Sequence, residues 1–175
     1  MSRRPNKVIP DTFTPIPSQR AHVDLHAVDA VADVAASGVV VHSDAEVPGD
    51  LGLSRDALRR AGFDAKVGDV LVLPGESASL PLAVGGGPLA EQSVDSLRDT
   101  AAAFARAAPR AGAVGLRLPV LGGVDARSAA QALTEGTLLA RYRYSVLRAE
   151  PKETALTGVQ LVLDVRPVAG GVVAG

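Results

Sequence analysis

The sequence predicts an α/β fold in three layers, in which a mixed sheet of about six strands lies between helices. Two observations carry this prediction. Segments with the two-residue period of strands alternate along the chain with segments of helical period. Several strand-like segments, such as 39–41 and 70–73, are continuous apolar runs and so need cover on both faces of the sheet. A helix–sheet–helix arrangement supplies that cover.

The first predicted elements are short. Residues 22–27 alternate polar and apolar side chains, as a half-buried strand does, and residues 39–41 form a β-branched run. Ser54 can then cap the N-terminus of a short helix over residues 55–61, which Gly62 would end. These segments predict two strands followed by a helix.

The next two strands indicate a mixed sheet. Residues 70–73 form an apolar run that stops at the Pro-Gly pair 74–75, and residues 79–84 form a second run that enters the glycine run 85–87. Only a short turn separates the two runs, too short for the crossover that parallel neighbours need. The sheet is therefore expected to contain both strand directions.

Two longer helices are predicted in the second half of the chain. The first, over residues 94–108, ends at Pro109, and Asp125 can cap the second. Both have a one-sided apolar stripe. The stripes consist of Val94, Leu97, Ala101, Phe104 and Ala108 in the first helix and of Ala129, Leu133, Thr137 and Ala140 in the second. Further strands are predicted over 113–118 and 158–165.

The composition is that of an ordinary globular domain. The 175 residues are 47% hydrophobic but only 3% aromatic, so the core must consist of Val, Leu and Ala. Because the net charge is −1, neither nucleic acid nor an anionic membrane is expected as a partner. The absence of cysteine excludes disulfides, thiol catalysis and thiolate metal sites, and it suits the cytoplasm, where we expect the protein.

The chain is predicted to have three parts. Residues 1–20 contain several prolines that would interrupt a helix, and we expect a flexible tail there. The arginine pair at 3–4 is not followed by the apolar run of an export signal, and no apolar stretch approaches the roughly 18 residues that span a bilayer. Residues 21–165 are expected to form one domain, and residues 166–175 a linker.

Two histidine motifs have plain structural interpretations. His22 and His26 have the helical spacing of zinc ligands, but on a strand about 13 Å separates positions four apart, too far for one ion. Residues 42–44, His-Ser-Asp, contain the residue types of a hydrolase triad in consecutive positions, so the side chains would point to opposite faces. We expect neither a metal ion nor serine hydrolysis at these positions.

Two glycine turns could offer backbone N–H groups to a phosphate. The run 85–87 lies between a predicted strand and a helix, and the pair 122–123 precedes the cap at Asp125. Neither spacing matches G-x-G-x-x-G or the P-loop, and Pro88 removes one donor. A strand-to-helix turn is the plain interpretation, and a phosphate contact is the alternative.

Both tyrosines of the chain lie at the end of the second long helix. We expect Gly136 to let that helix lie close to the sheet and Leu139 to help bury it. Tyr142 would close the junction, so that truncating it would cost roughly 2–4 kcal/mol. Arg141, beside it, is expected to be exposed and almost neutral for stability.

The same segment resembles a known family. Residues 135–144, EGTLLARYRY, resemble the E-G-x-x-L-x-x-Y-x-[FY] segment that closes the N-terminal domain of the cytosolic leucyl aminopeptidase family. The runs LVLPG at 71–75 and LAVGGG at 82–87 are similar to that family's paired strands, and the later helix and strands follow in the same order. The resemblance covers roughly residues 21–165.

The resemblance implies a macro-like domain that is not itself catalytic. In the family, two divalent metal ions, Zn or Mn, belong to a separate C-terminal domain with the motif N-T-D-A-E-G-R. Residues 43–46, SDAE, lack the residues that flank this motif, and we interpret the match as chance. No catalytic, metal-binding or cofactor-binding residue is therefore expected in this chain.

The resemblance also implies partners and a function. The expected partners are the chain's own catalytic domain and like subunits of a homo-oligomer. The expected function is a non-catalytic contribution to assembly or access in an enzyme that removes N-terminal amino acids from peptides. The alternative function is a stand-alone macro-like module that binds ADP-ribose or a related nucleotide.

Overall fold

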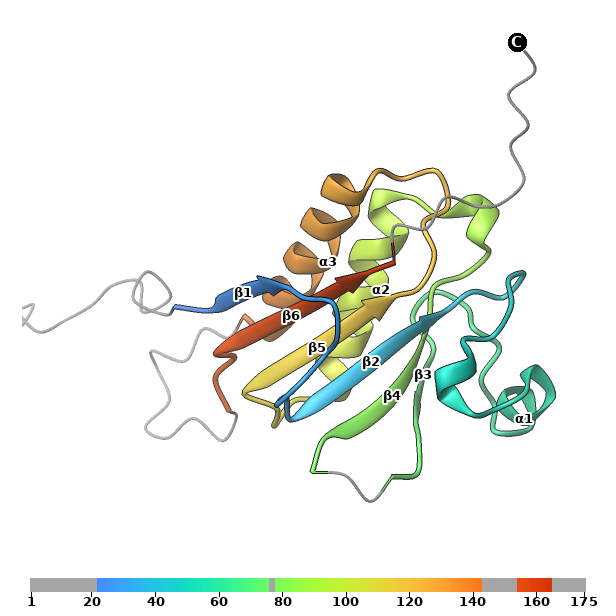
Figure 1. Ribbon diagram of the computed structural model, residues 1–175, viewed down its shortest axis with the longest axis horizontal. Helices are drawn as coiled ribbons and strands as arrows, with labels where there is room; N and C mark the ends of the chain where they lie inside the picture. The colour runs from blue at the N-terminus through green and yellow to red at the C-terminus, as the bar shows by residue number, and fades with distance from the viewer. Residues whose placement is uncertain (1–21, 76–77, 143–153, 165–175) are drawn as a thin grey trace, which may run out of the picture.

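The computed structural model describes residues 22–75, 78–142 and 154–164. Its centre is a six-stranded sheet with the order β1-β6-β5-β2-β4-β3 (Figure 1). Neighbouring strands pair in parallel, except that β3 pairs antiparallel with β4. The mixed sheet predicted from the short turn between two apolar runs is confirmed.

The elements lie within a few residues of their predicted positions. The strands are β1 (Asp24–Ala27), β2 (Ala36–Val41), β3 (Val70–Val72), β4 (Leu80–Gly85), β5 (Ala113–Leu118) and β6 (Gly158–Leu163). The helices are α1 (Arg55–Arg60), α2 (Val94–Ala107) and α3 (Ala126–Arg141), with the single 3-10 turns η2 (Gly49–Leu51) and η3 (Leu89–Glu91). The prediction at β2 was too short, because Ala36 and Gly38 were not counted as strand formers.

The predicted helix caps are present. The Ser54 side chain accepts a hydrogen bond from the Ala57 amide at the start of α1. The Asp125 carboxylate accepts one from the Ser128 amide at the start of α3. Such caps satisfy amides that have no partner within the helix, and each stabilises the helix by about 1 kcal/mol.

One face of the sheet is covered by α2 and α3, which run side by side behind it (Figure 1). The main core fills the space between the sheet and these two helices, and the predicted apolar stripes contribute to it. Its largest fully buried side chains include Phe104, Leu97, Leu116, Leu133 and Val40. Gly38 lies opposite Phe104, where a Cβ atom would come within 2.7 Å of the ring.

The other face has thinner cover. The short helix α1 packs there at one side through Leu58, in a second cluster with Phe63, Val41 and Ala83. The segment between β1 and β2 crosses the face as well, and Val31 lies against Gly115 of β5. The predicted three-layer α/β class is confirmed, with α2 and α3 on one face and, among the described residues, the short helix α1 on the other.

The prediction of a flexible tail at 1–20 and of a linker at 166–175 concerns residues outside the described ranges. Among the described residues, no helix is both long and apolar enough to cross a membrane. The last described strand, β6, pairs with β5 and β1, and so places the C-terminal part of the predicted domain inside the sheet.

Candidate functional site

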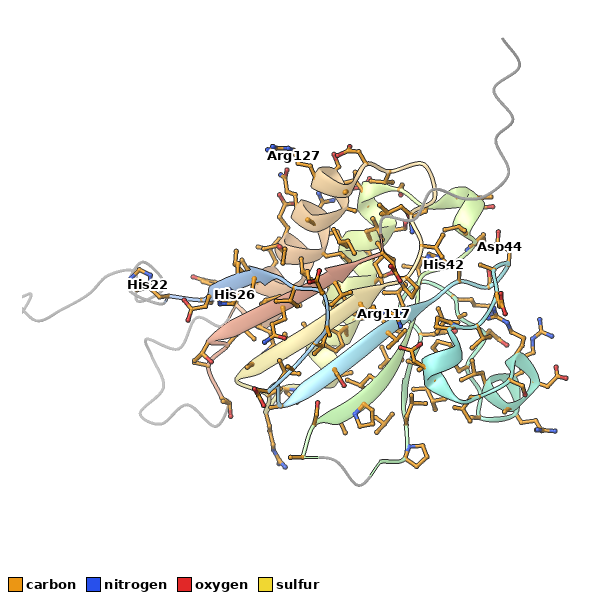
Figure 2. The ribbon with its side chains drawn as sticks, in the orientation of Figure 1. His22, His26, His42, Asp44, Arg117 and Arg127 are labelled. Atoms are coloured by element: carbon orange, nitrogen blue, oxygen red, sulfur yellow. The ribbon has the colours of Figure 1, made fainter. Side chains whose placement is uncertain are left out.

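In open α/β sheets, ligands bind beside the carboxyl ends of the parallel strands, and we call this end of the sheet the carboxyl edge. The parallel strands β2, β4 and β5 all end there. The predicted motifs at 42–44, 85–87 and 122–123 lie at or after the ends of these three strands. The topology therefore brings together three motifs that lie far apart in the sequence. Figure 2 shows His42 and Asp44 at this edge.

His42 is buried at this edge and makes hydrogen bonds through both ring nitrogens. Its relative exposure is 2%, and its Nδ1 lies 3.1 Å from the Gly87 carbonyl oxygen. Its Nε2 lies 3.2 Å from the side-chain nitrogen of Gln92, whose Oε1 accepts a hydrogen bond of 2.7 Å from the Gly122 amide. We call the chain His42–Gln92–Gly122 the His42 relay.

The relay fixes the protonation of the ring. The Gly122 amide can only donate, so Gln92 must present its oxygen to Gly122 and its NH₂ group to His42. His42 Nε2 is then the acceptor. At the other end, the Gly87 carbonyl can only accept, so Nδ1 carries the proton. His42 is a neutral ring with one allowed tautomer, and sequence reasoning, which considered only a triad, missed Gln92.

Asp44 caps the 3-10 turn that follows the glycine run. Its Oδ1 accepts a hydrogen bond of 2.5 Å from the Leu89 amide, and its Oδ2 accepts one from Ala90 at 3.4 Å. The bond from Leu89 is the main cause that lowers the pKa of Asp44, and burial opposes it. The Asp44 carboxylate is thus engaged by backbone amides, and the two ring nitrogens of His42 are engaged by Gly87 and Gln92.

The two glycine turns are packed against protein atoms. At Gly85 a Cβ atom would lie 1.9 Å from the Lys66 carbonyl oxygen, and at Gly86 it would lie 2.7 Å from His42 Cε1. At Gly122 it would lie 2.3 Å from the Leu89 carbonyl oxygen. These glycines are needed for close approach of the protein to itself, which supports the plain turn interpretation.

The thinly covered face of the sheet has a hollow of about 740 Å³, whose lining includes Val39, Arg117 and Val162. Arg117 pairs with Asp50 and, at 3.2 Å, with Asp164. Burial disfavours its charged form, but the hydrogen bonds to Asp164 and Asp50 outweigh burial and raise its pKa. The guanidinium in the hollow is therefore already neutralised by two carboxylates.

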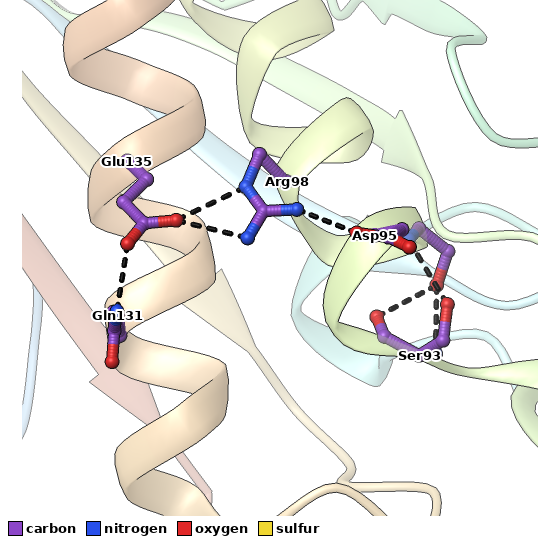
Figure 3. A network of polar contacts seen from close by, with 6 residues as sticks. Ser93, Asp95, Arg98, Gln131 and Glu135 are labelled. Atoms are coloured by element: carbon purple, nitrogen blue, oxygen red, sulfur yellow. Dashed lines mark hydrogen bonds and ion pairs between the residues drawn. The ribbon is translucent and has the colours of Figure 1, made fainter.

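The helix pair α2–α3 is joined by a surface network. Figure 3 shows Arg98 of α2 between Asp95 and Glu135. Its Nη2 lies 2.9 Å from Glu135 and its Nη1 2.6 Å from Asp95. Hydrogen bonds from Gln131 and then Arg98 lower the pKa of Glu135. All these groups lie at or near the surface, so the network aligns the helices and offers no buried charge for chemistry.

Two predictions for this helix pair were wrong. Gly136 does not approach the sheet: a Cβ atom there would lie 2.1 Å from the Arg98 carbonyl oxygen, so the glycine brings α3 close to α2. Leu139 and Tyr142 do not bury the helix end, since their relative exposures are 67% and 54%. The apolar pattern suggested a buried junction, but these positions face away from the sheet. The second tyrosine lies outside the described residues.

Arg141 was predicted to be exposed, but it is partly buried and its guanidinium binds backbone carbonyls, an arrangement that we call the Arg141 clamp. Its Nη1 donates to the Ala108 carbonyl at 2.7 Å. Its Nη2 lies within 3.0 Å of the carbonyls of Pro109, Ala111 and Thr154. The side chain thus joins the end of α2, the start of β5 and the segment before β6. Cations at a helix C-terminus also interact favourably with its dipole.

The described residues contain no group of three or more His, Asp or Glu side chains that could hold a metal ion. His26 lies on β1 and His22 just before it, and both are exposed, far from His42 in Figure 2. The two divalent ions that the resemblance implies therefore do not fit the side chains of this part of the chain.

Comparison with known proteins identifies the family. The family model described as "Cytosol aminopeptidase family, N-terminal domain" matches residues 31–151. That match covers more than half of the 175-residue chain, so the chain belongs to the cytosol aminopeptidase family and represents its N-terminal domain. A comparison with curated proteins finds no match.

Solved structures agree with this assignment. The bottromycin maturation enzyme BotP, in complex with Mn, is 30% identical, with a TM-score of 0.58, over 73% of this chain and 26% of its own. A second structure of BotP is 32% identical, with a TM-score of 0.56, over 73% and 27%. A mutant tomato leucine aminopeptidase shares the fold, with a TM-score of 0.67 at 20% identity over 81% and 32%. The chain thus spans only a quarter to a third of these proteins.

Proposed function

We propose that this chain is the non-catalytic N-terminal domain of a metal-dependent aminopeptidase, and that it contributes to assembly or to substrate access. The observation that carries the proposal is the family match over residues 31–151, from just before β2 to beyond α3. The proteins in the solved structures are about three to four times longer than the part they share with this chain. The catalytic domain, with two divalent ions such as Zn or Mn, is the proposed partner.

The polar chemistry of the described residues supports a non-catalytic role. A two-metal peptidase needs carboxylates that converge on the ions, which activate water and polarise the scissile carbonyl. Here Asp44 caps η3, Asp125 caps α3, and Asp50 and Asp164 hold Arg117. These carboxylates already have structural partners, and they lie on separate elements.

The nucleotide-binding alternative has no comparable support. A diphosphate at the carboxyl edge would be expected to bind free amides of the glycine run or of the helix that follows it. In this chain the Leu89 amide already binds the Asp44 carboxylate, and the Gly122 amide binds Gln92. At Gly86 and Gly122 there is no space even for a Cβ atom, because His42 and Leu89 lie against their backbones. The edge is closed by the protein's own groups.

The test of the non-catalytic role is an aminoacyl reporter assay on the purified chain, without metal and with added Zn²⁺ or Mn²⁺. No metal-dependent release is expected. The double variant D44A/E46A is the matched control, because it removes the acidic pair of the SDAE segment. Release that depends on metal and disappears in this variant would refute the proposal.

The proposed assembly role has its own measurement. The chain is expected to self-associate in the cytoplasm, where we propose that it resides. Sedimentation velocity over a range of protein concentrations would detect this association. A monomer at every concentration would contradict a contribution of this domain to contacts between like subunits, and would leave only the contact with its own catalytic domain.

A further inference from the structure

The His42 relay links three turns at the carboxyl edge by a single buried histidine. His42 follows β2, the Gly87 carbonyl follows β4, and Gly122 follows β5, while Gln92 lies just after η3. The relay thus couples segments that are 30 to 50 positions apart in the chain. The three turns keep their relative placement as long as each donor faces an acceptor.

Protonation of the ring would destroy that match. A second proton on Nε2 would face the NH₂ group of Gln92, which is also a donor. If the Gln92 amide turned over to accept this proton, its NH₂ group would face the Gly122 amide, again a donor. Either orientation leaves two donors opposed, and a buried donor without a partner costs about 1–3 kcal/mol.

While the carboxyl edge is closed, water cannot reach the charged ring to accept a hydrogen bond from its second proton. His42 is 2% exposed, Gln92 is 8% exposed, and the backbone at Gly86 lies directly against the ring. The charged groups that act on the ring are the Asp44 carboxylate, which favours the imidazolium, and Arg55, which opposes it and donates to the His42 carbonyl. Burial is the largest effect and lowers the pKa of His42.

We propose that the His42 relay is a pH-sensitive switch: protonation of His42 releases the turn at 119–124 from Gln92 and opens the carboxyl edge locally. This turn leads into the cap of α3 and lies against η3, where Gly122 packs on Leu89. Opening lets the imidazolium reach water and leaves the central sheet intact. The inference is independent of the proposed function, since it rests only on contacts within the domain.

The direction of the pH effect follows from the pKa. An exposed histidine has a pKa of about 6.5, whereas that of closed His42 is lower, so the open form binds the proton more strongly. The closed edge is fully favoured above about pH 6.5 and loses stability as the pH falls from there toward the pKa of closed His42. Asp44, Asp125 and Glu135 have lowered pKa values and respond only in a more acidic range.

Amide hydrogen exchange of the complete chain between pH 7.5 and 5 tests the switch. After correction for the intrinsic rate, protection of the Gly122 amide is expected to fall by up to about tenfold per pH unit below about 6.5. Amides at the centre of β5 should not change. Constant protection at Gly122, or an equal fall throughout β5, would overturn the proposal, the latter because it means global unfolding.

Variants assign the effect to the relay. His42→Asn keeps a donor for the Gly87 carbonyl and cannot take up a proton, so protection of Gly122 should no longer depend on pH. Gln92→Leu should lower this protection at every pH. His26→Asn, which changes an exposed histidine of β1, should keep the wild-type dependence. A pH dependence that survives in His42→Asn would overturn the proposal.

A measurement on the unmodified chain covers the case in which His42→Asn fails to fold. The ¹⁵N chemical shifts of the His42 ring at pH 7.5 should show a protonated Nδ1 and an unprotonated Nε2. On titration, the Nε2 shift should change together with the loss of Gly122 protection. The opposite tautomer, or a ring that titrates without any change at Gly122, would refute the relay.

Discussion

Replacing Arg141 by methionine should destabilise the domain by about 2–4 kcal/mol. Hydrogen bonds from a charged donor contribute about 1.5–3 kcal/mol each in net terms. Arg141 lies near four carbonyl oxygens, on Ala108, Pro109, Ala111 and Thr154, but three of them share Nη2, which has only two hydrogens. The sum is therefore well below four independent bonds. Methionine keeps much of the aliphatic stem, so the loss reports on the guanidinium.

The assay is urea denaturation at neutral pH, followed by far-UV circular dichroism, with Arg106→Met as the matched control. Arg106 lies in the last turn of α2 and is exposed, so its loss should change the free energy of unfolding by no more than about 0.5 kcal/mol. Arg141→Lys keeps the charge but not the fork of donors, and should fall between the two.

The expected order separates the clamp from the earlier hypothesis of a tyrosine junction. Tyr142→Ala should cost less than about 1 kcal/mol, because the residue has a relative exposure of 54%. The clamp would be refuted if Arg141→Met cost no more than Arg106→Met. A loss for Tyr142→Ala larger than that for Arg141→Met would restore the interpretation of the segment as an aromatic packing junction.

Three further changes test the helix pair and the carboxyl edge. Gly136→Ala should lower the free energy of unfolding by roughly 1–3 kcal/mol, because its Cβ atom would overlap the Arg98 carbonyl. Gly49→Ala is the control, because there is open space around Gly49. Equal losses in the two variants would contradict the close contact between the helices. Arg98→Gln should cost less than about 1 kcal/mol, since the network is largely solvated. Calorimetry with ADP-ribose should show no binding, and a micromolar dissociation constant that is lost in Gly86→Val would favour the nucleotide-binding alternative.

Periodicity predicted the fold because it reflects local geometry. Most positions of the apolar stripes at three- and four-residue steps lie on the buried faces of α2 and α3, although Val94 at the start of α2 is exposed. The predicted caps at Ser54 and Asp125 start α1 and α3. The short turn between the third and fourth predicted strands correctly predicted that β3 and β4 pair antiparallel. Each of these signals concerns neighbours within a few residues, where chain geometry leaves few choices.

The polar contacts could not be predicted in the same way. Arg141 binds carbonyls more than 30 residues earlier in the chain, and Gln92 meets His42 across 50 positions. Backbone carbonyls are identical at every residue, so the sequence gives no sign of which ones will meet a guanidinium. The one local signal at the carboxyl edge was that three polar or glycine-rich motifs each come at or after the end of a strand. These motifs meet in space only because β2, β4 and β5 are parallel neighbours in the sheet.

The composition explains why these polar contacts matter for stability. Gly136 of α3 lies against Arg98 and Ala101 of α2, and the buried core of the two helices includes Ala129 and Ala132, whose small side chains bury little apolar area each. At both ends of the parallel strands, side chains that bind backbone groups add to this apolar packing. Arg141 joins the segments that lead into β5 and β6, and the His42 relay joins the turns that follow β2, β4 and β5. A guanidinium stays charged at every physiological pH, whereas an imidazole does not. Mild acid should thus loosen the carboxyl edge and leave the opposite edge closed.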